Sequence, residues 1–430
     1  MSTPFLGLVL FFLVLMFLGM PLSFCMIFSS LVYFVLAKRD LYLLVHQMFT
    51  GIDTFTLMAI PFFMLAGELM VYSGTAEKLM NFANLLVGRF RGGLAYVNVL
   101  ASMLFGGCSG SALADVAGLG VLEMKVMEEG GYDKPFSAAL TVTSSIQGPI
   151  IPPSIPMVLI GAVTGTSIGG LLLGGAIPGV LVGLAQCLVV FSLARRRGFP
   201  RSECRLDWKS KLRIVLDSIP FLIMPFIILG GIIGGIFTPT EAAGIAVAYG
   251  LALTLGYRKK IEWKHLVRIF MRAGVLSAAL LMLSAASNVF TWILATEKVP
   301  DAFVKLLLSI SENPYVVLFI VNVFLLVWGM FMDMLPAILI LAPILFPLAQ
   351  RLGLHPIHFG VVMGFNLIVG LITPPYGAAL FTGAVVSGVP MEKLVKETVP
   401  FLVASIAVLF LITYVPQCVM FFPTLFGLDR

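Results

Sequence analysis

Long apolar runs without a charged residue dominate this chain, and short polar segments separate them. A membrane-spanning helix needs about 20 apolar residues, so the runs predict about ten or more helical crossings. They are continuous rather than alternating, which argues against a barrel of membrane-spanning strands. The runs that lack Asp, Glu, Lys and Arg are residues 5–37, 135–194, 218–240, 273–296, 313–332, 352–391 and 398–428.

The first of these runs is too long for one straight crossing and for a cleavable signal peptide. A signal peptide has an apolar core of about 7 to 15 residues after a basic start, and no basic residue precedes this run. As one helix, residues 5–37 would reach roughly 50 Å, at about 1.5 Å per residue. We therefore expect retained membrane helix that tilts, extends beyond the bilayer or breaks near Gly19, Met20 and Pro21.

Composition supports an integral membrane protein. Hydrophobic residues make up 60% of the chain and charged residues 11%, which leaves too little polar surface for a soluble globule. The net charge of +6 gathers at the predicted helix ends, where positive-inside anchoring explains it better than a nucleic-acid partner. The 5 cysteines lie far apart and indicate neither a disulfide framework nor a metal site.

A Gly-x-x-x-Pro-Pro element occurs twice, at residues 148–153 and 370–375, 222 positions apart. The same offset pairs residues 161–163 with 383–385 and Gly107 with Gly329. It also pairs Lys38 and Arg39 with the basic run 258–260. If the two halves are inverted, these basic clusters lie on opposite faces of the membrane, which the positive-inside rule disfavours. The orientation of the protein therefore stays open.

We therefore predict two related halves, residues 1–194 and 214–430, joined by the polar connector 195–213. Residues 38–53 and 258–272 mix charges with aromatic side chains and predict paired amphipathic helices along the membrane surface.

Each Pro-Pro element predicts a broken membrane helix. Proline removes amide donors, and the carbonyl groups left behind need protein, water or an ion as a partner. The carbonyl ends of a broken helix attract Na⁺, whereas the amide ends attract a carboxylate. Duplicated breaks at matching positions therefore indicate the binding site of a secondary transporter.

A Gly- and Ser-rich segment at residues 106–115 ends with a carboxylate inside apolar sequence. Its oxygen atoms suit a small cation, although small residues also serve plain helix packing. Asp115 and its neighbour in the other half, Asp333, are functional candidates because intramembrane acids are costly. Glu241 after a Thr-Pro pair resembles a helix cap, and we assign Glu68 no role.

At these residues the chain resembles, from end to end, the large membrane subunit of a tripartite ATP-independent periplasmic (TRAP) transporter of the DctM-like family. The resemblance implies an all-α polytopic membrane protein with inverted repeats, broken helices and two re-entrant hairpins, like others of the ion transporter superfamily. It also implies a sodium-driven elevator importer of organic acids in the bacterial inner membrane. The matching stretches are residues 60–68, 106–115, 148–156, 235–243 and 371–375.

The family further implies two partners, a small four-helix membrane subunit (Q-type) and a soluble periplasmic substrate-binding protein (P-type). Family pattern and internal symmetry together give two sodium sites rich in backbone oxygen, with Na⁺ as the coupling ion and no organic cofactor. The first comprises Gly107, Gly148, Ile151 and Ser154, and the second Gly329, Gly370, Thr373 and Tyr376. The substrate candidates are Ser109, Ser111, Asp115, Thr143, Ser144, Ser145, Asp333 and Asn366.

Three other functions remain open from the sequence. A stand-alone sodium symporter or exchanger would need no binding protein. An intramembrane serine hydrolase is suggested by Ser109, which lies in a Gly-x-Ser-Gly sequence. It is disfavoured because no histidine lies in a convincing membrane span to activate that serine. A channel fits less well than alternating access, because broken helices with pockets favour the latter.

Overall fold

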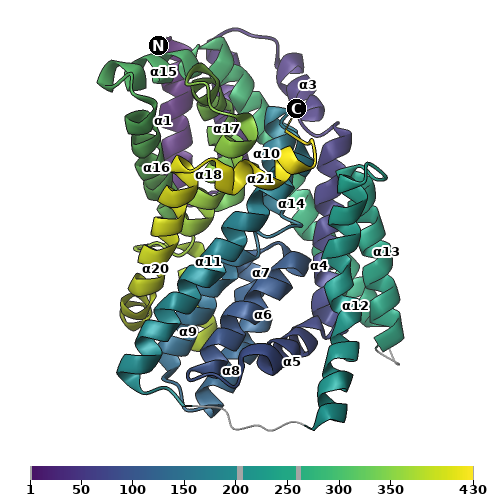
Figure 1. Ribbon diagram of the computed structural model, residues 1–430. Coiled ribbons are helices and arrows are strands. Elements are labelled where there is room, and N and C mark those ends of the chain that lie inside the picture. Colours follow the sequence, from purple (N-terminus) through teal and green to yellow (C-terminus); the bar gives the residue numbers. More distant parts are fainter. Residues whose placement is uncertain (1, 201–206, 258–262, 430) are drawn as a thin grey trace.

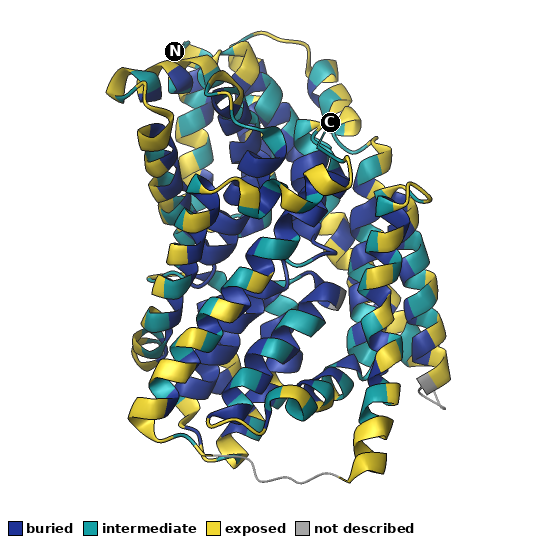
Figure 2. Ribbon diagram, in the orientation of Figure 1, coloured by how far each residue is buried: buried dark blue, intermediate teal, exposed yellow. Residues whose placement is uncertain are grey.

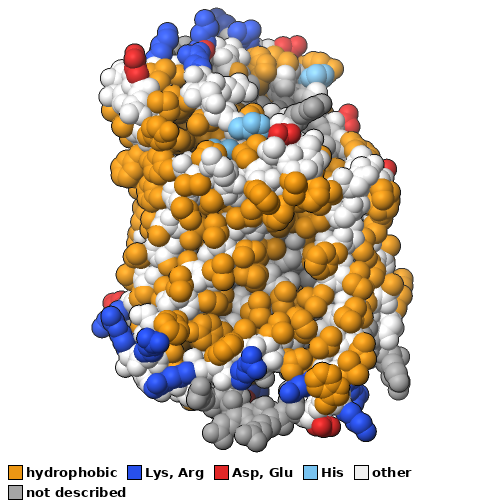
Figure 3. Space-filling view, in the orientation of Figure 1, with side chains coloured by type: hydrophobic (Ala, Val, Ile, Leu, Met, Phe, Trp, Pro, Cys, Tyr) orange, Lys and Arg blue, Asp and Glu red, His pale blue; other side chains and the backbone are white. Residues whose placement is uncertain are grey.

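The structure is a computed structural model that describes residues 2–200, 207–257 and 263–429, and its regular elements there are helices. Within those residues, seven helices are long and apolar enough to cross a membrane, and further apolar helices are shorter. Figure 3 shows a broad hydrophobic belt between two ends that carry the charged side chains. The chain is therefore a polytopic membrane protein made of helices, as predicted.

The first apolar run does break where expected. Helix α1 (Thr3–Phe17) and helix α2 (Leu22–Leu36) pack against each other, and the turn between them contains Gly19 at a φ of 77°. Pro21 follows immediately before α2, where its missing amide costs no helical hydrogen bond. The long run is thus a helical pair rather than one tilted helix.

The remaining elements of the first half include α4, which packs on helices of the second half. The helix hairpin and the broken helix lie between α6 and α11 (Figure 1). The elements are α3 (Leu41–Thr50), a 3-10 turn (Phe55–Met58), α4 (Ala59–Ser73), α5 (Thr75–Val87), α6 (Gly93–Ser109), α7 (Ala112–Ala117), α8 (Leu119–Glu129), α9 (Lys134–Ser144), a 3-10 turn (Ser145–Gln147), α10 (Ile155–Thr164) and α11 (Ile168–Arg197).

The second half repeats this order, and from α15 onward its helix starts follow the 222-residue offset closely, whereas α12 begins well before the offset position of α1. The second arm is an exception: residues 258–262, which include the basic run 258–260, lie outside the described residues, and Trp263 begins one continuous helix. Residues 51–54, Gly-Ile-Asp-Thr, separate α3 from the next turn in the first half, whereas the offset residues 273–276 are Ala-Gly-Val-Leu and continue the helix, so no separate surface helix forms. The elements are α12 (Trp208–Ile233), α13 (Pro239–Tyr257), α14 (Trp263–Thr296), α15 (Val299–Ile310), α16 (Pro314–Phe331), α17 (Met334–Arg351), α18 (Pro356–Gly370), α19 (Ala378–Ser387), α20 (Met391–Tyr414) and α21 (Gln417–Leu425).

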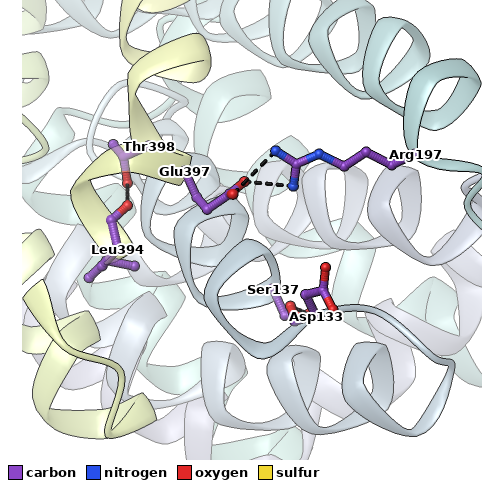
Figure 4. A network of polar contacts seen from close by, with 6 residues as sticks. All are labelled: Asp133, Ser137, Arg197, Leu394, Glu397 and Thr398. Carbon is purple, nitrogen blue, oxygen red and sulfur yellow. Dashed lines mark hydrogen bonds and ion pairs between the residues drawn. The ribbon is translucent and has the colours of Figure 1, made fainter. Parts of the chain in front are cut away.

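Helices α11 and α20 occupy matching places in the two halves and run antiparallel. The C-terminal end of α11 meets the N-terminal end of α20, where Arg197 donates to Glu397 at 2.8 and 3.2 Å (Figure 4). The guanidinium of Arg197 also lies 5.6 Å from the ring centre of Phe136, at the start of α9. Matching helices of opposite direction make the repeats inverted.

The core lies where the two halves interlock. Helix α10 of the first half packs on α17 and α18 of the second, while α19 of the second packs on α7 and α9 of the first. Every residue of α18 from Ile357 to Gly370 is buried, as Figure 2 shows for the middle of the molecule. Such all-round burial explains why α18 is apolar on every face rather than amphipathic.

Candidate functional site

The first helix break lies between α9 and α10, around a Pro152–Pro153 peptide bond in the cis form. Because prolines carry no amide hydrogen, the carbonyl groups of Gly148 and Pro149 lose their helical donors. The hydroxyl of Ser154 donates to the Pro149 carbonyl and also caps α10 through the Met157 amide at 3.3 Å. The carbonyl oxygens of Gly148 and Ile151 accept no hydrogen bond from the residues that the structure describes.

The tip of the α6–α7 hairpin presses backbone against backbone on this break. A Cβ atom built on Gly106 would lie 2.6 Å from the Cα atom of Gly148, and one on Gly107 would lie 3.4 Å from the Pro152 carbonyl oxygen. Gly110 ends α6 at a φ of 62°, a conformation that favours glycine. Glycine therefore lets polar backbone groups of the hairpin and the break converge.

The second break, between α18 and α19, has the same kind of contact. A Cβ atom built on Gly370 would lie 2.6 Å from the Cα atom of Gly329 in α16. The hydroxyl of Thr373 donates to the Val369 carbonyl at 2.8 Å. The side chain of Tyr376 is exposed, so only its backbone can serve a site inside the protein.

The structure thus brings the four residues of each sodium candidate set to one helix break. Sequence reasoning missed Gly106, which makes the contact with Gly148 that Gly329 makes with Gly370. The 222-residue offset pointed to Gly107 instead, and the Gly106-Gly107 pair left a one-residue ambiguity that only the packing resolves.

Three of the substrate candidates gather at the first hairpin tip. The Ser109 hydroxyl donates to one carboxylate oxygen of Asp115, and the Ser111 side chain caps α7. The other oxygen of Asp115 faces Gly148 and has no hydrogen-bond partner among the described residues. Ser109 and Ser111 line a small cavity of about 60 Å³ together with Glu68.

The other substrate candidates lie elsewhere. Thr143 and Ser145 donate to carbonyl groups of their own helical turns, and Ser144 joins a buried network with α6. Asn366 is buried and donates to Asn322 at 2.7 Å. Asp333 caps α17 by accepting from the Met334 amide at 2.7 Å, so it marks the tip of the second hairpin.

The structure shows the interaction partners of two acidic residues, which the sequence could not identify. Glu241 accepts from the Thr238 amide and hydroxyl, both at 2.8 Å, which confirms the expected helix cap. Glu68, which received no role, forms an ion pair of 3.3 Å with Arg272 of α14. It therefore adds a charge pair beside the hairpin cavity.

Sequence reasoning also missed Glu123, a carboxylate that is only 2% exposed in α8. Its neighbours Lys125, Glu128 and Glu129 are exposed and gave the segment the look of a solvated surface. Its place on the same face of α8 as the apolar Leu119, Met124 and Met127 was the available signal for burial.

Three features define the protein as a polytopic membrane protein of the secondary transporter class. They are the inverted repeats, the two broken helices, and the two hairpins whose tips contact the unwound backbone of these breaks. A structure search supports this fold: the YdaH transporter of Alcanivorax borkumensis aligns with a TM-score of 0.57 at 15% identity, covering 87% of each chain.

The sequence matches the family of the tripartite ATP-independent periplasmic transporter, DctM component, over residues 9–418, and the chain belongs to that family. It is 40% identical to the sialic acid TRAP transporter large permease protein SiaM of Vibrio cholerae, covering 96% of each chain. It is 38% identical to the C4-dicarboxylate TRAP transporter large permease protein DctM of Pseudomonas aeruginosa, covering 89% of this chain and 90% of the relative. The protein is therefore the large permease of a TRAP transporter, not an enzyme.

Proposed function

We propose that the protein imports an organic acid with sodium as the coupling ion. The observation that carries this proposal is the matched pair of glycine contacts, Gly106 on Gly148 and Gly329 on Gly370. Each contact sets a hairpin tip against a helix break, which concentrates backbone oxygen atoms inside an apolar core.

Sodium suits both breaks because a small hard cation prefers oxygen ligands and needs no charged side chain when several carbonyl dipoles converge. At the first break, Gly148 and Ile151 offer free carbonyl oxygens and Ser154 a hydroxyl, with Gly107 closing the set from the hairpin. At the second break, Gly329, Gly370, Thr373 and Tyr376 would supply the ligands.

The substrate is an organic anion. Relatives are named for sialic acid, C4-dicarboxylates and isethionate, all of which carry a negative charge. The cavity at Ser109 and Ser111 includes Ile155 at the N-terminal start of α10, where helix amides favour an anion. Arg272 beside Glu68 adds a positive charge within reach of that cavity.

Charge distribution supports one orientation in the membrane. The end of the molecule that contains the Arg197–Glu397 pair carries more Lys and Arg than the opposite end, which contains both termini (Figures 1 and 3). The positive-inside rule then places this richer end in the cytoplasm of a bacterial inner membrane. By the helix ends that carry them, its basic residues include Arg89, Arg91, Lys125, Lys134, Arg195, Arg196, Arg197, Lys209, Lys211, Arg213, Lys393 and Lys396, against Lys38, Arg39, Lys298, Lys305 and Arg351 at the other.

The mechanism is an elevator movement of the inner helices against the outer ones. Helices α6–α11 and α16–α21 interlock through both breaks, and they would move as one body. Helices α1–α4 and α12–α14 would form the scaffold, with α5 and α15 as connecting arms. The small membrane subunit would enlarge this scaffold, and a periplasmic binding protein would deliver the substrate.

Uptake of labelled organic acid into proteoliposomes tests the proposal. The large permease is reconstituted with its small membrane subunit, and the sodium gradient and the binding protein are each supplied or omitted. Uptake that requires both supports the tripartite sodium importer. Uptake from free substrate with sodium alone would instead establish a stand-alone symporter, and uptake without sodium would refute sodium coupling.

A further inference from the structure

A chain of buried polar side chains links α9 to α8 through α6 and ends at Glu123. The Asn98 amide donates to the Thr141 hydroxyl at 2.7 Å, and the Ser144 hydroxyl donates to the Asn98 oxygen at 2.8 Å. Ser102 lies next in the chain, 2.9 Å from the Ser144 oxygen and 3.3 Å from a carboxyl oxygen of Glu123.

The number of hydroxyl protons in this network indicates which group donates in the contact between Ser102 and Glu123. A serine hydroxyl has one proton to donate. Ser102 is closer to Ser144 than to Glu123, so its proton is better used on Ser144. The hydroxyl of Ser102 faces both acceptors with one proton, so both contacts are full hydrogen bonds at once when the carboxyl group of Glu123 carries a proton and donates it.

The surroundings of Glu123 also disfavour a bare carboxylate. Its second oxygen, Oε2, is buried and has no hydrogen-bond partner within the described part of the chain. None of the ion pairs formed by described residues includes Glu123. An unpaired buried charge costs several kcal/mol or more, which neutralisation by a proton avoids.

Charged groups on the neighbouring helices do not supply a counter-charge. The helices packed against α8 are α5, α6, α7, α9 and α19. Asp115 on α7 is a buried acid, so its ionised form would add repulsion rather than relief. The other titratable groups on these helices and on α8 are Glu77 and Lys78 of α5, Tyr96 and Cys108 of α6, Lys134 of α9, and the exposed Lys125, Glu128 and Glu129 of α8 itself.

The link to Glu123 belongs to one half of the protein alone. At the 222-residue offset, Ser144 corresponds to Asn366, which donates to Asn322 of α16, so a buried polar contact recurs there. Asn98, Ser102 and Glu123 correspond to the apolar Ile320, Phe324 and Leu345, so the carboxyl end of the network does not recur. Glu123 therefore serves something other than the paired ion sites.

We propose that Glu123 is a proton-binding site of the first hairpin, and that its proton holds α8 against α6 in the transport-competent structure. At alkaline pH the proton passes to solvent hydroxide and leaves a carboxylate. The single proton of Ser102 then turns from Ser144 to Glu123, which removes one of the hydrogen bonds between α6 and α9 and leaves the two made by Asn98. Transport slows as a result.

Infrared spectroscopy of the purified permease tests the proton directly and needs neither sodium coupling nor substrate. The carbonyl stretching band of a protonated carboxylic acid should be present in the wild type at neutral pH and weaken as pH rises. Glu123→Gln should remove that band, whereas Glu128→Gln, a matched change on the exposed face of α8, should keep it. Equal bands in the wild type and in E123Q would overturn the proposal, as would loss of the Glu123 band on adding Na⁺ at constant pH.

Transport gives a second, independent readout. The fall in uptake at alkaline pH should be largely absent in Glu123→Gln, whose amide stays neutral, and should persist in Glu128→Gln. An identical alkaline fall in all three proteins would overturn the proposal. If Glu123→Gln does not fold, Glu123→Asp serves the same purpose, because a shorter acid must shift both the frequency of the band and the pH at which it disappears.

Discussion

Gly106 and Gly148 lie so close together that a Cβ atom on Gly106 would be 2.6 Å from the Cα atom of Gly148. Gly329 and Gly370 repeat the relationship in the other half, where a Cβ atom on Gly370 would be 2.8 Å from the Gly329 carbonyl oxygen. Backbone atoms cannot turn aside as a flexible side chain can. Each hairpin tip is therefore fixed to its helix break through glycine.

Substituting Ala for Gly106 should lower sodium-driven uptake at least tenfold. The added methyl group must push the hairpin tip away from the break, and overpacking of this kind typically costs ~1–3 kcal/mol. The loss should appear as a higher sodium concentration for half-maximal uptake, measured beside thermal unfolding of the purified protein. Gly370→Ala should have the same effect at the second break.

Gly244→Ala is the control for both changes, because a Cβ atom at Gly244 would meet nothing within 4 Å. It should leave uptake and thermal stability close to those of the wild type. Normal sodium dependence in Gly106→Ala would mean that the contact between hairpin and break has no part in the ion site.

Ser154→Ala should weaken sodium binding less than a bulky residue at Gly148 does. The change removes one hydroxyl, which leaves the Pro149 carbonyl without its donor and α10 without its cap. A lost buried hydrogen bond costs ~1–3 kcal/mol. By contrast, Gly148→Leu would drive its side chain into the Asp115 carboxylate, which lies 2.5 Å from the position of a Cβ atom.

Sodium titrations of uptake compare the two variants, with Ser154→Thr as the conservative control that keeps the hydroxyl. Full sodium-driven uptake in Gly148→Leu would contradict the first ion site. Equal losses in Ser154→Ala and Ser154→Thr would show that the hydroxyl is not what matters.

The sequence predicted the architecture because its strongest signals are covalent. Proline at 152, 153, 374 and 375 removes amides wherever the chain goes, and the apolar runs leave no alternative to helices in a membrane. The length of the first apolar run left a tilt, an extension beyond the bilayer or a break near Gly19 open, and the structure shows the break. These features depend on local chemistry, which one sequence displays in full.

The side-chain partners of the site could not be predicted in the same way. The sequence predicts Asn366 as a polar residue that lines the substrate site, yet its amide donates to Asn322, which lies 44 positions away in the chain. Glu123 looked solvated because three charged residues follow it closely. Which polar group is paired and which is left free depends on helices brought together from distant sequence.

Gln186→Leu should destabilise the protein and disturb the first break. The Gln186 amide donates to the Thr143 carbonyl at 2.7 Å and its oxygen accepts from Gln147 at 2.7 Å, with both side chains buried. Leucine is similar in size but leaves both groups unpaired, at a cost of ~1–3 kcal/mol for each. Thermal unfolding should show a lower Tm, and Gln186→Glu should recover part of it by accepting from Gln147.

An unchanged Tm in Gln186→Leu would mean that water replaces the lost partners. The matched surface control is Leu188→Ala, since the Leu188 side chain is 69% exposed on the same helix. It should unfold at nearly the same temperature as the wild type.

The ion pair between Arg197 and Glu397 should contribute little to stability, despite its two short contacts. The two side chains are 35% and 21% exposed, so water and salt screen their attraction. A double-mutant cycle of Arg197→Ala and Glu397→Ala should give a coupling free energy of ~0.5 kcal/mol, and added salt should reduce it. Arg197→Ala alone should cost more than Glu397→Ala, because it also removes the packing of Arg197 over the Phe136 ring. A coupling well above 1 kcal/mol that survives high salt would instead show that the pair is shielded from solvent, and that this end of α11 and α20 is locked rather than loosely joined.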